Sequence, residues 1–540
     1  MSAIGNIPVP RNEPVKSYAP GTPERAELQA AVRDLGQQVT EIPVAIDGVH
    51  HHHAADRGVF SPQRHQHRLA NLASATPPML EQAISGAVRA QREWASWRFE
   101  DRAAVFLRAA ELLAGPWRQR LNAATLLGQG KTPHQAEIDA ACELIDFLRF
   151  NVHYAERLMH EQPGSSDNAW NRLDHRPLEG FIYAITPFNF TAIGGNLPTA
   201  PAILGNTVLW KPSATASLSN WLFYQLLEEA GLPPGVIQFV PGDAVAVSDA
   251  LLASPDFAGL HFTGSTAVFR SLWRKSAEHL DRYRSYPRIV GETGGKDFIV
   301  AHPSADVEAL VTALLRGAYE YQGQKCSAAS RCYIPRSLWP EVKERMAAEL
   351  AAMKVGDPAD FGVFVGAVID ERSWTKLDGV LQAARSDSGA EIVAGGNADR
   401  SEGWFVSPTF VRVDDPHHRM MREEFFGPIL TAYVYDDGAW SDVLRLVDDT
   451  AEYALTGSVF ARDRGALVEA DGALRNAAGN FYINDKCTGA VVGQQPFGGG
   501  RASGTNDKAG SILNLYRWIS PRTIKEVGAP PTDWRYPYLG

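Results

Sequence analysis

The sequence predicts an α/β fold in two lobes, each built on a mostly parallel sheet. The chain has 540 residues, more than the roughly 250–300 residues at which a single hydrophobic core stops growing. From residue 180 onward, short apolar runs alternate with helical segments, which is the pattern of βαβ units. The alternation restarts at residue 297 and continues to about residue 485, so we expect the lobes to meet near residues 291–296.

Individual elements follow from local periodicity. Residues 77 to about 160 have the apolar spacing of helices, and we predict Asp101 as the N-cap of one of them. Residues 1–30 are rich in Pro and polar groups and are expected to form an extended arm. Further helices are expected near residues 218–230 and 247–253. Strands are expected at residues 181–185, 207–210, 236–240, 259–262, 297–301, 404–406 and 429–435.

Composition and charge exclude several classes of protein. A content of 45% hydrophobic and 21% charged residues is that of an ordinary soluble globular protein. A net charge of −10 argues against nonspecific attraction to nucleic acid or to an anionic membrane, so neither is an expected partner. The sequence has no run of 18 or more apolar residues, so we expect no transmembrane helix.

The cysteines and the N-terminal segment favour a reducing, cytoplasmic setting. The four cysteines form no CxxC pair and no zinc pattern, so no metal site is expected. The run from His50 to His53 lacks nearby acidic or thiol partners, and its role stays open. The first thirty residues include several glutamates and lack the apolar region of a secretory signal. The cysteines are Cys142, Cys326, Cys332 and Cys487.

Cys326 and Glu292 are the candidate catalytic pair. Cys326 lies in a small, polar, Gly-containing segment, whereas a core cysteine normally lies among large apolar residues. Lys325 beside it is expected to favour the reactive thiolate. Glu292 lies between glycines, so its carboxylate can reach a cleft. A thiol that attacks a carbonyl and a carboxylate that moves a proton or activates water suit covalent catalysis.

Four further segments carry a resemblance to a known family. In their order and spacing along the chain, together with Cys326 and Glu292, they resemble the aldehyde dehydrogenase superfamily from about Asn12 to the C-terminal region. The segments are Ile185-Thr-Pro-Phe-Asn-Phe190, Leu209-Trp-Lys-Pro-Ser213, Phe262-Thr-Gly-Ser-Thr266 and Glu423-Glu-Phe-Phe-Gly-Pro428.

The resemblance implies a domain plan. We expect an aldehyde dehydrogenase-like fold with two Rossmann-like α/β lobes and a small β oligomerisation element. An N-terminal arm at residues 1–60 precedes an NAD-binding domain at residues 61–290, which contributes part of the oligomerisation element near residues 160–180. A catalytic domain at residues 291–490 precedes a return segment and a C-terminal oligomerisation tail at residues 491–540. A homodimer or a higher homo-oligomer is therefore expected.

The expected cofactor is NAD, with NADP left open. No GxGxxG fingerprint follows a predicted strand. Instead, a helix that starts after the strand ending at Phe262 would point free N–H groups at a pyrophosphate, although such a start is also routine. Many members of the family have an acidic residue where this chain has Ala214, and its loss removes a barrier to a 2′-phosphate. By resemblance, the cofactor-binding residues are Thr186, Lys211, Gly264, Ser265, Thr266, Ala267, Val268 and Glu424.

The resemblance also implies the chemistry. Cys326 attacks the aldehyde carbon, Asn189 donates to the resulting oxyanion, and Glu292 activates water to hydrolyse the thioester. A lone Asn189 would otherwise be interpreted as a turn-forming amide.

The C-terminal segments Gly479-Asn-Phe-Tyr-Ile-Asn-Asp485 and Gln494 to Asp507 are similar to the branch that oxidises L-glutamate γ-semialdehyde, the open form of Δ1-pyrroline-5-carboxylate. That reaction belongs to proline degradation, so a proline dehydrogenase is a candidate partner. Phe190, Lys325 and Ser503 are the candidate substrate-binding residues, with a tight turn as the alternative for Ser503. Another ω-semialdehyde, such as succinate semialdehyde, and a cysteine acyl hydrolase without redox chemistry stay open as alternatives.

Overall fold

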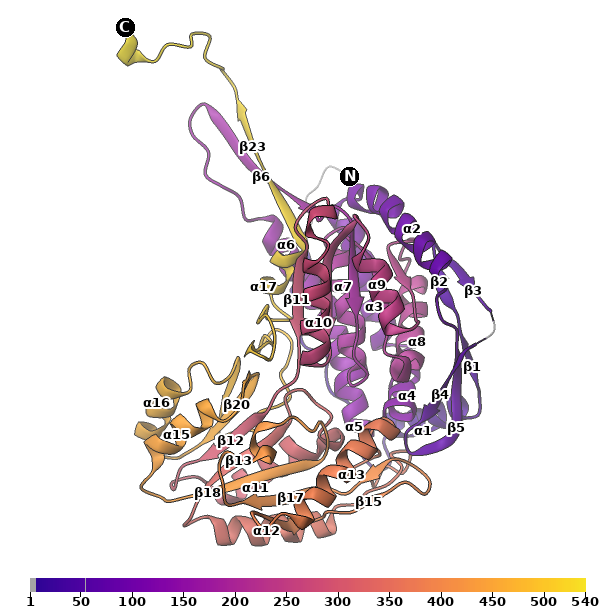
Figure 1. Ribbon diagram of the computed structural model, residues 1–540. Coiled ribbons are helices and arrows are strands. Elements are labelled where there is room, and N and C mark those ends of the chain that lie inside the picture. Colours follow the sequence, from indigo (N-terminus) through magenta and orange to yellow (C-terminus); the bar gives the residue numbers. More distant parts are fainter. Residues whose placement is uncertain (1–5, 54) are drawn as a thin grey trace.

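Two large sheets organise the computed structural model, which describes residues 6–53 and 55–540 (Figure 1). Each of these sheets has seven strands and is covered by helices on both faces. The prediction of an α/β fold in two lobes is therefore confirmed. Within the described residues, no helix is both long and apolar enough to cross a membrane.

The first sheet, in the upper body in Figure 1, consists mainly of parallel strands. Strand β2 joins it antiparallel to both β9 and β3. Alternate residues of β7 pack into different cores, with Phe181 and Tyr183 in one and Ile182 and Ala184 in the other. Both faces are buried, as in other parallel sheets. The order is β11 (Arg288–Glu292), β10 (Phe257–Thr263), β7 (Phe181–Ile185), β8 (Thr207–Lys211), β9 (Ile237–Phe239), β2 (Val44–Ile46) and β3 (Val49–His51).

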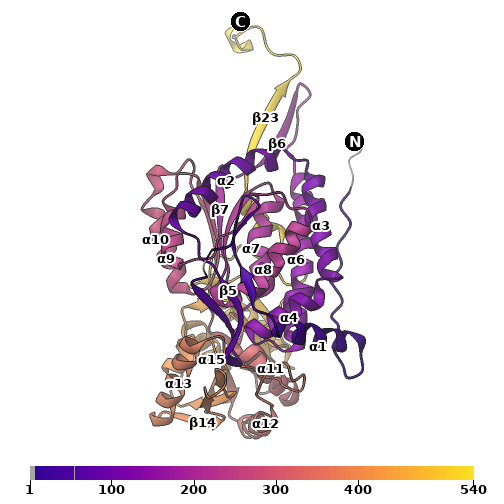
Figure 2. The same ribbon diagram turned by 90° about the vertical axis from the view of Figure 1, so that its right-hand side faces the viewer.

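Two groups of helices cover this sheet (Figure 2). One face packs against α2 (Pro77–Ser96), α9 (Ala244–Leu252) and α10 (Thr266–Ala277). The other packs against α3 (Phe99–Ala114), α4 (Arg118–Gln129), α6 (Leu144–Met159), α7 (Thr191–Ile203) and α8 (Ser217–Glu229).

The prediction that Asp101 is an N-cap is wrong. Helix α3 begins at Phe99 after the N-cap Arg98, and Asp101 accepts a hydrogen bond from the Arg98 guanidinium, with an Nε–O distance of 3.0 Å. An acidic residue is favourable in the first turn as well as at the cap, because both positions meet the positive end of the helix dipole.

The N-terminal segment is only partly an arm. Residues 6–19 contain no helix or strand, but α1 (Pro23–Gly36) is helical where an extended chain was expected. Strands β2 and β3 also lie inside the predicted arm of residues 1–60, because the apolar run Val44–Ile46 is fully buried in the first sheet. A separate small sheet contains β1 (Thr40–Ile42), β5 (Arg64–Leu72) and β4 (Arg57–Ser61).

The second sheet forms the lower body in Figure 1. Its strands are parallel except for the antiparallel pair β14 and β17. Helices α11 (Val307–Tyr319) and α12 (Trp339–Ala352) pack on one face, and α13 (Glu371–Ser386), α15 (Trp440–Asp449) and α16 (Arg464–Ala473) pack on the other. The order is β14 (Ala390–Ala394), β17 (Thr409–Val413), β18 (Ile429–Tyr435), β13 (Ala329–Pro335), β12 (Asp297–Ala301), β20 (Thr456–Phe460) and β21 (Asn480–Ile483).

A two-stranded ribbon projects from the upper body and carries the C-terminus far from it (Figure 1). Its strands β6 (Ala169–Pro177) and β23 (Ile519–Val527) pair antiparallel along their whole length. The strand predicted at residues 404–406 is present as β16 (Phe405–Val406), which pairs with β15 (Ala398–Asp399) in a separate two-stranded sheet and does not join the second large sheet.

The remaining elements are short. Among them, η1 (Glu137–Glu143) is a π-helix, and the sequence did not indicate it. The others are α5 (Pro133–Ala136), η2 (Ala214–Ala216), η3 (Leu280–Arg282), η4 (Glu320–Gly323), α14 (Arg419–Arg422), β19 (Tyr453–Ala454), β22 (Gly500–Arg501), α17 (Ile512–Leu515), η5 (Tyr516–Trp518) and η6 (Pro537–Leu539).

Candidate active site

The segment between β11 and β12 connects the two lobes and brings three parts of the site together. Its two glycines permit close approach. A Cβ added at Gly294 would lie 2.2 Å from a carboxylate oxygen of Glu424, and one added at Gly295 would lie 2.6 Å from the carbonyl oxygen of Cys326. Only glycine leaves room for both contacts. Glu292, at the end of β11, directly precedes this segment.

Cys326 lies in the turn between η4 and β13 and is partly exposed. The turn follows Tyr321 and Gln322, whose φ angles of 53° and 56° are left-handed. Burial raises the pKa of the Cys326 thiol, and the nearby carboxylates Asp297 and Glu292 raise it further. The resting group is therefore a protonated thiol beside several acids. The other three cysteines are buried.

Lys325 does not activate the thiol as we expected from its position in the sequence. Its side chain is buried, and Nζ donates to Oε2 of Glu320 at 2.9 Å. Adjacent residues in a turn point in different directions, so proximity along the chain did not place this ammonium beside the sulfur. Its predicted contact with substrate is likewise replaced by this ion pair.

Asn189 lies beside the catalytic turn. Its side chain is buried, and Nδ2 donates to the carbonyl of Gln324 at 3.0 Å. Gln324 is two residues from Cys326, so the amide is held close to the thiol. The predicted donor and nucleophile are therefore together, although they come from different lobes.

Glu292 has the environment of a proton-transfer group. Burial raises the pKa of its carboxyl well above the ordinary value, the backbone N–H of Gly499 lowers it, and Asp507 raises it again. Lys508 lowers the pKa through its charge. Oε2 is buried and has no hydrogen-bond partner among the described residues. A carboxyl with a raised pKa is a stronger base when ionised, and the unbonded oxygen can meet a water molecule, so the group is suited to accept and release a proton.

The predicted cofactor residues gather at the C-terminal edge of the first sheet. Helix α10 starts directly after β10, and its N-cap Ser265 accepts from the N–H of Val268 at 3.4 Å. Gly264 donates its N–H to the carbonyl of Glu292 at 3.2 Å. Thr266 starts the helix, whereas Ala267 and Val268 are exposed. The free N–H groups of this helix start therefore fit a pyrophosphate.

Strand ends beside this helix carry Lys211 and Thr186, whereas Glu424 comes from the second lobe, between α14 and β18. Lys211 ends β8, and burial lowers the pKa of its ammonium to about 8. Thr186 follows β7 and accepts a hydrogen bond from Nε1 of Trp210 at 3.0 Å. Glu424 accepts from the N–H of Gly295 at 3.0 Å. The edge of a parallel sheet beyond its carboxyl ends is the usual position of a dinucleotide, so these residues fit NAD.

Ser503 is a correction to the predicted substrate site. The residue is fully buried, and its hydroxyl accepts from the N–H of Ala454 at 3.1 Å. Its carbonyl accepts from the N–H of Thr293 at 2.9 Å. It therefore stabilises the turn beside Glu292, which was the alternative we left open, and does not present its hydroxyl to substrate.

A cluster of charged residues near the thiol escaped prediction. Phe190, the predicted aromatic contact, lies with its ring centre 3.9 Å from Nζ of Lys131. Lys131 donates to Asp139 at 2.6 Å, and both are fully buried. Glu143 ends the π-helix η1 and is close enough to raise the pKa of Cys326. A π-helix often marks a functional site, but the sequence of residues 137–143 has no feature that predicts a π-helix.

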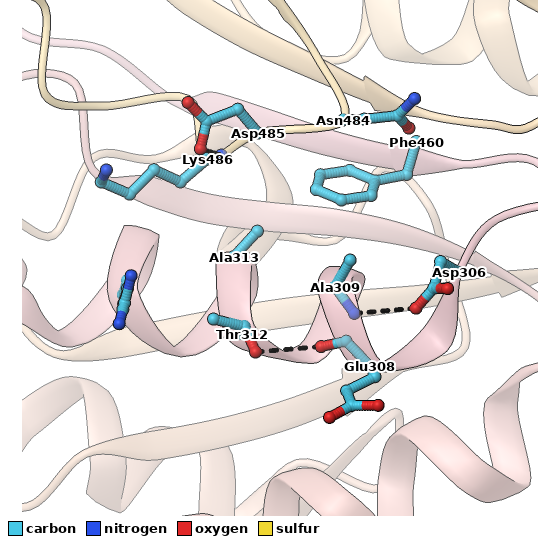
Figure 3. Close-up of a pocket in the computed structure, with 10 residues that line it drawn as sticks. Asp306, Glu308, Ala309, Thr312, Ala313, Phe460, Asn484, Asp485 and Lys486 are labelled. Carbon is cyan, nitrogen blue, oxygen red and sulfur yellow. Dashed lines mark hydrogen bonds between the residues drawn. The ribbon is translucent and has the colours of Figure 1, made fainter.

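A cavity of about 430 Å³ lies elsewhere, on the second lobe (Figure 3). Figure 3 shows Asp306, the N-cap of α11, and Ala309 of α11 on one side and Asn484 and Lys486, which follow β21, on the other. No predicted site residue lines it, so it is separate from the thiol. In the His run, Nε2 of His50 bonds Glu228 at 2.8 Å, and the described residues hold no group of three metal-binding side chains.

Comparisons with known proteins agree with this geometry. The model of the Aldehyde dehydrogenase family matches residues 50–524. A relative from Dictyostelium discoideum named Delta-1-pyrroline-5-carboxylate dehydrogenase, mitochondrial, is 52% identical over 540 residues, covering 99% of this chain and 97% of its own. A relative of the same name from Homo sapiens is 50% identical over 529 residues, covering 98% of this chain and 94% of its own.

Solved structures match as closely. The structure of the Delta-pyrroline-5-carboxylate dehydrogenase from Mycobacterium tuberculosis bound with NAD has a TM-score of 0.97 and 52% identity, with 100% of both chains covered. Proline utilization A from Bdellovibrio bacteriovorus has a TM-score of 0.92 and 25% identity, with 98% of this chain and 55% of that chain covered. The chain described here belongs to the aldehyde dehydrogenase family.

Proposed function

We propose that this chain oxidises L-glutamate γ-semialdehyde, the open form of Δ1-pyrroline-5-carboxylate, to L-glutamate with NAD in proline degradation. One observation carries the proposal: a partly exposed Cys326 lies among carboxylates where the two lobes meet. The names of relatives that are about 50% identical over nearly the whole chain support the choice of aldehyde.

The reaction begins when the Cys326 sulfur adds to the aldehyde carbon and loses its proton to a nearby carboxylate. The resulting oxyanion accepts hydrogen bonds from Asn189 Nδ2 and from the Cys326 backbone N–H, and one such donor typically contributes about 3–4 kcal/mol. Bound NAD supplies the hydride acceptor. Loss of the hydride from the reacting carbon leaves a thioester at Cys326. Ionised Glu292 then takes a proton from the water that attacks the thioester, the C–S bond breaks to release the acid, and the sulfur leaves as a thiolate that regains its proton from the protonated Glu292.

Electrostatics support an amino acid as the substrate. Glu143 is partly exposed and close enough to Cys326 to raise its pKa. In its ionised form, Glu143 is placed to bind the substrate ammonium several ångströms beyond the reacting carbonyl. The Phe190 ring packs against the connecting methylenes, which succinate semialdehyde also has, but succinate semialdehyde has no ammonium.

We propose NAD rather than NADP, and the structure of an NAD-bound relative supports this choice. Ala214 removes one barrier to a 2′-phosphate, so relative rates with the two coenzymes decide the preference. The proposed catalytic domain, which carries the nucleophile, keeps residues 291–490. The proposed cofactor domain of residues 61–290 also includes β2 and β3 from the predicted arm.

A second copy of the chain is the proposed partner. A two-stranded ribbon is marginally stable alone in water, yet β6 and β23 project from the body (Figure 1). Strand β21 ends the second sheet with an unpaired edge in the described residues. Edge pairing between copies would stabilise both features. A proline dehydrogenase as supplier of the substrate and a cytoplasmic location also stay predictions.

The test is the rate of NADH formation, followed by absorbance, with glutamate semialdehyde and with succinate semialdehyde. We expect a much higher kcat/KM for glutamate semialdehyde. A clear preference for succinate semialdehyde would contradict the substrate assignment. Cleavage of an ester without any aldehyde-dependent gain of absorbance would indicate an acyl hydrolase instead.

A further inference from the structure

The ammonium of Lys131 is fully buried and lies against the ring of Phe190, the aromatic residue that is proposed to contact the substrate. Lys131 follows α4 and Gly130, and its Nζ is 2.6 Å from Oδ2 of Asp139. The same nitrogen is 3.9 Å from the ring centre of Phe190 and 4.5 Å from that of Tyr321. It therefore contacts the faces of two aromatic rings from different lobes.

The partner of Lys131 fixes the segment that carries Asn189. Asp139 also accepts from the N–H groups of Thr191 and Ala192, at 3.0 and 2.8 Å. These are the first residues of α7, directly after Phe190. One carboxylate thus binds the ammonium and the start of this helix together.

The same loop also contacts the turn that carries Cys326. The carbonyl of Gly130 accepts from Nε2 of Gln322 at 3.0 Å. On the other side, Nε2 of Gln129 donates to the carbonyl of Phe188 at 2.6 Å. Residues 129–131 therefore lie between the two segments whose relative position defines the oxyanion site.

We propose that Lys131 is a positioning residue, whose buried charge holds Phe190 and Tyr321, and through them Asn189 and Cys326, in the reactive arrangement. Replacing a buried ion pair by apolar side chains is often neutral or stabilising, so stability alone does not account for this one. A cation held between two ring faces specifies the orientation of both rings. The effect of Lys131 on substrate binding through Glu143 rests on the proposed function, whereas its positioning role applies to the oxidation of any aldehyde.

Lys131 also acts on Glu143. Burial and the charge of Asp139 raise the pKa of Glu143 to about 8. Lys131 and Lys325 lower that pKa, and Asp146 raises it. Loss of the Lys131 charge therefore raises the pKa of Glu143. The ionised form that binds an ammonium then predominates only at higher pH.

The test compares three variants: Lys131→Met, Lys131→Arg and a double variant that combines Lys131→Met and Asp139→Asn. The double variant leaves no unpaired buried charge, so it is available if Lys131→Met alone fails to fold. We expect each to lower kcat by about 10²-fold, as misplacement by 1 Å does, with the NAD dissociation constant unchanged. Arg120→Met is the matched control, because Arg120 lies on α4, the helix that precedes Lys131, with its guanidinium 4.7 Å from the Trp117 ring.

The pH profile of KM, relative to wild type at each pH, separates positioning from a loss of folded protein. KM should fall as pH rises, because Glu143 becomes ionised and binds the substrate ammonium. In Lys131→Met this fall should occur at higher pH than in the wild type, whereas in Lys131→Arg it should occur at the same pH. Three results would overturn the proposal. The first is a wild-type kcat in the double variant, the second is a loss of kcat no larger than the unfolded fraction of the protein, and the third is an equal loss of kcat in the Arg120→Met control.

Propanal, which has no ammonium, distinguishes this inference from the substrate assignment. We expect the kcat loss with both aldehydes and the pH shift with glutamate semialdehyde alone. If the wild type oxidises propanal but not glutamate semialdehyde, the proposed function is wrong. The effect of the Lys131 variants on kcat with propanal still tests the positioning role of Lys131. An unchanged kcat with propanal in all three variants refutes the positioning role.

Discussion

Two glutamates, Glu137 and Glu292, have opposite environments. Glu137 accepts from Tyr18 Oη at 2.7 Å, from Asn122 Nδ2 at 2.8 Å and from the guanidinium of Arg118. Although burial favours its neutral form, these bonds lower the pKa of Glu137 below the ordinary value. Glu292 is partly exposed as a residue, but its Oε2 atom is buried without a partner in the described residues, and its pKa is raised.

The difference separates a structural acid from a reactive one. Glu137 connects the extended N-terminal segment to α4 and stays ionised, so its bonds contribute to the stability of the fold. Among the described residues, Oε2 of Glu292 has no hydrogen-bond partner beside the segment between β11 and β12, which is unfavourable for folding but leaves the group able to transfer a proton. Substitutions at the two sites should therefore have different effects.

The largest effect is expected for Cys326→Ala. Loss of the nucleophile should reduce NADH formation by on the order of 10⁶-fold, because the covalent route is removed. NAD binding should persist, since α10 and β8 are untouched. Steady-state kinetics and titration of NAD by fluorescence measure the two quantities. Cys487→Ala is the matched control, because that thiol is buried and donates to the Ser327 carbonyl at 3.5 Å. Turnover surviving in Cys326→Ala would refute the nucleophile assignment.

Glu292→Gln should lower kcat by about 10²–10⁴-fold, because a general base typically contributes that factor. The first turnover should still release NADH, so stopped-flow absorbance should show a burst followed by a slow phase. Stability should stay at or above the wild-type value, since the amide removes a buried carboxyl. A wild-type steady-state rate argues against the assigned role.

Glu137→Gln should affect folding instead. Removing one member of a buried ion pair typically costs about 3–5 kcal/mol, which urea unfolding would measure. The effect should be present at neutral pH and fade as pH falls, because the lowered pKa of Glu137 contributes stability only above the carboxyl's unfolded pKa and is lost as the folded form protonates. A large kcat change in the folded fraction contradicts the distinction between the two acids.

The smallest effects are expected at the neighbours of Glu292. Since Lys508 lowers and Asp507 raises the pKa of Glu292, Lys508→Met should move the rise of kcat to higher pH, and Asp507→Asn should move it to lower pH. Charges at this range contribute about 1 kcal/mol, or severalfold in rate. Shifts in the same direction in both pH–rate profiles exclude this electrostatic account.

Prediction from the sequence succeeded where burial produces a pattern of apolar residues along the chain. Strands such as 181–185 and 297–301 are buried on both faces, so they are continuous apolar runs with clear bounds. Cys326 and Glu292 could be identified because polar and glycine-rich surroundings are unusual for buried groups. Side-chain direction carries no such signal, which explains the errors at Lys325 and Ser503. Lys131 is fully buried just after α4, in a stretch predicted as helical, where a charged residue normally indicates a solvated face.

The most direct measurement is mass spectrometry of Glu292→Gln after mixing with NAD and glutamate semialdehyde. Our account predicts a stable acyl group on the peptide that contains Cys326, formed only when NAD is present. An acyl group on another residue, or rapid turnover without any adduct at that sulfur, would contradict covalent catalysis at the junction of the two lobes.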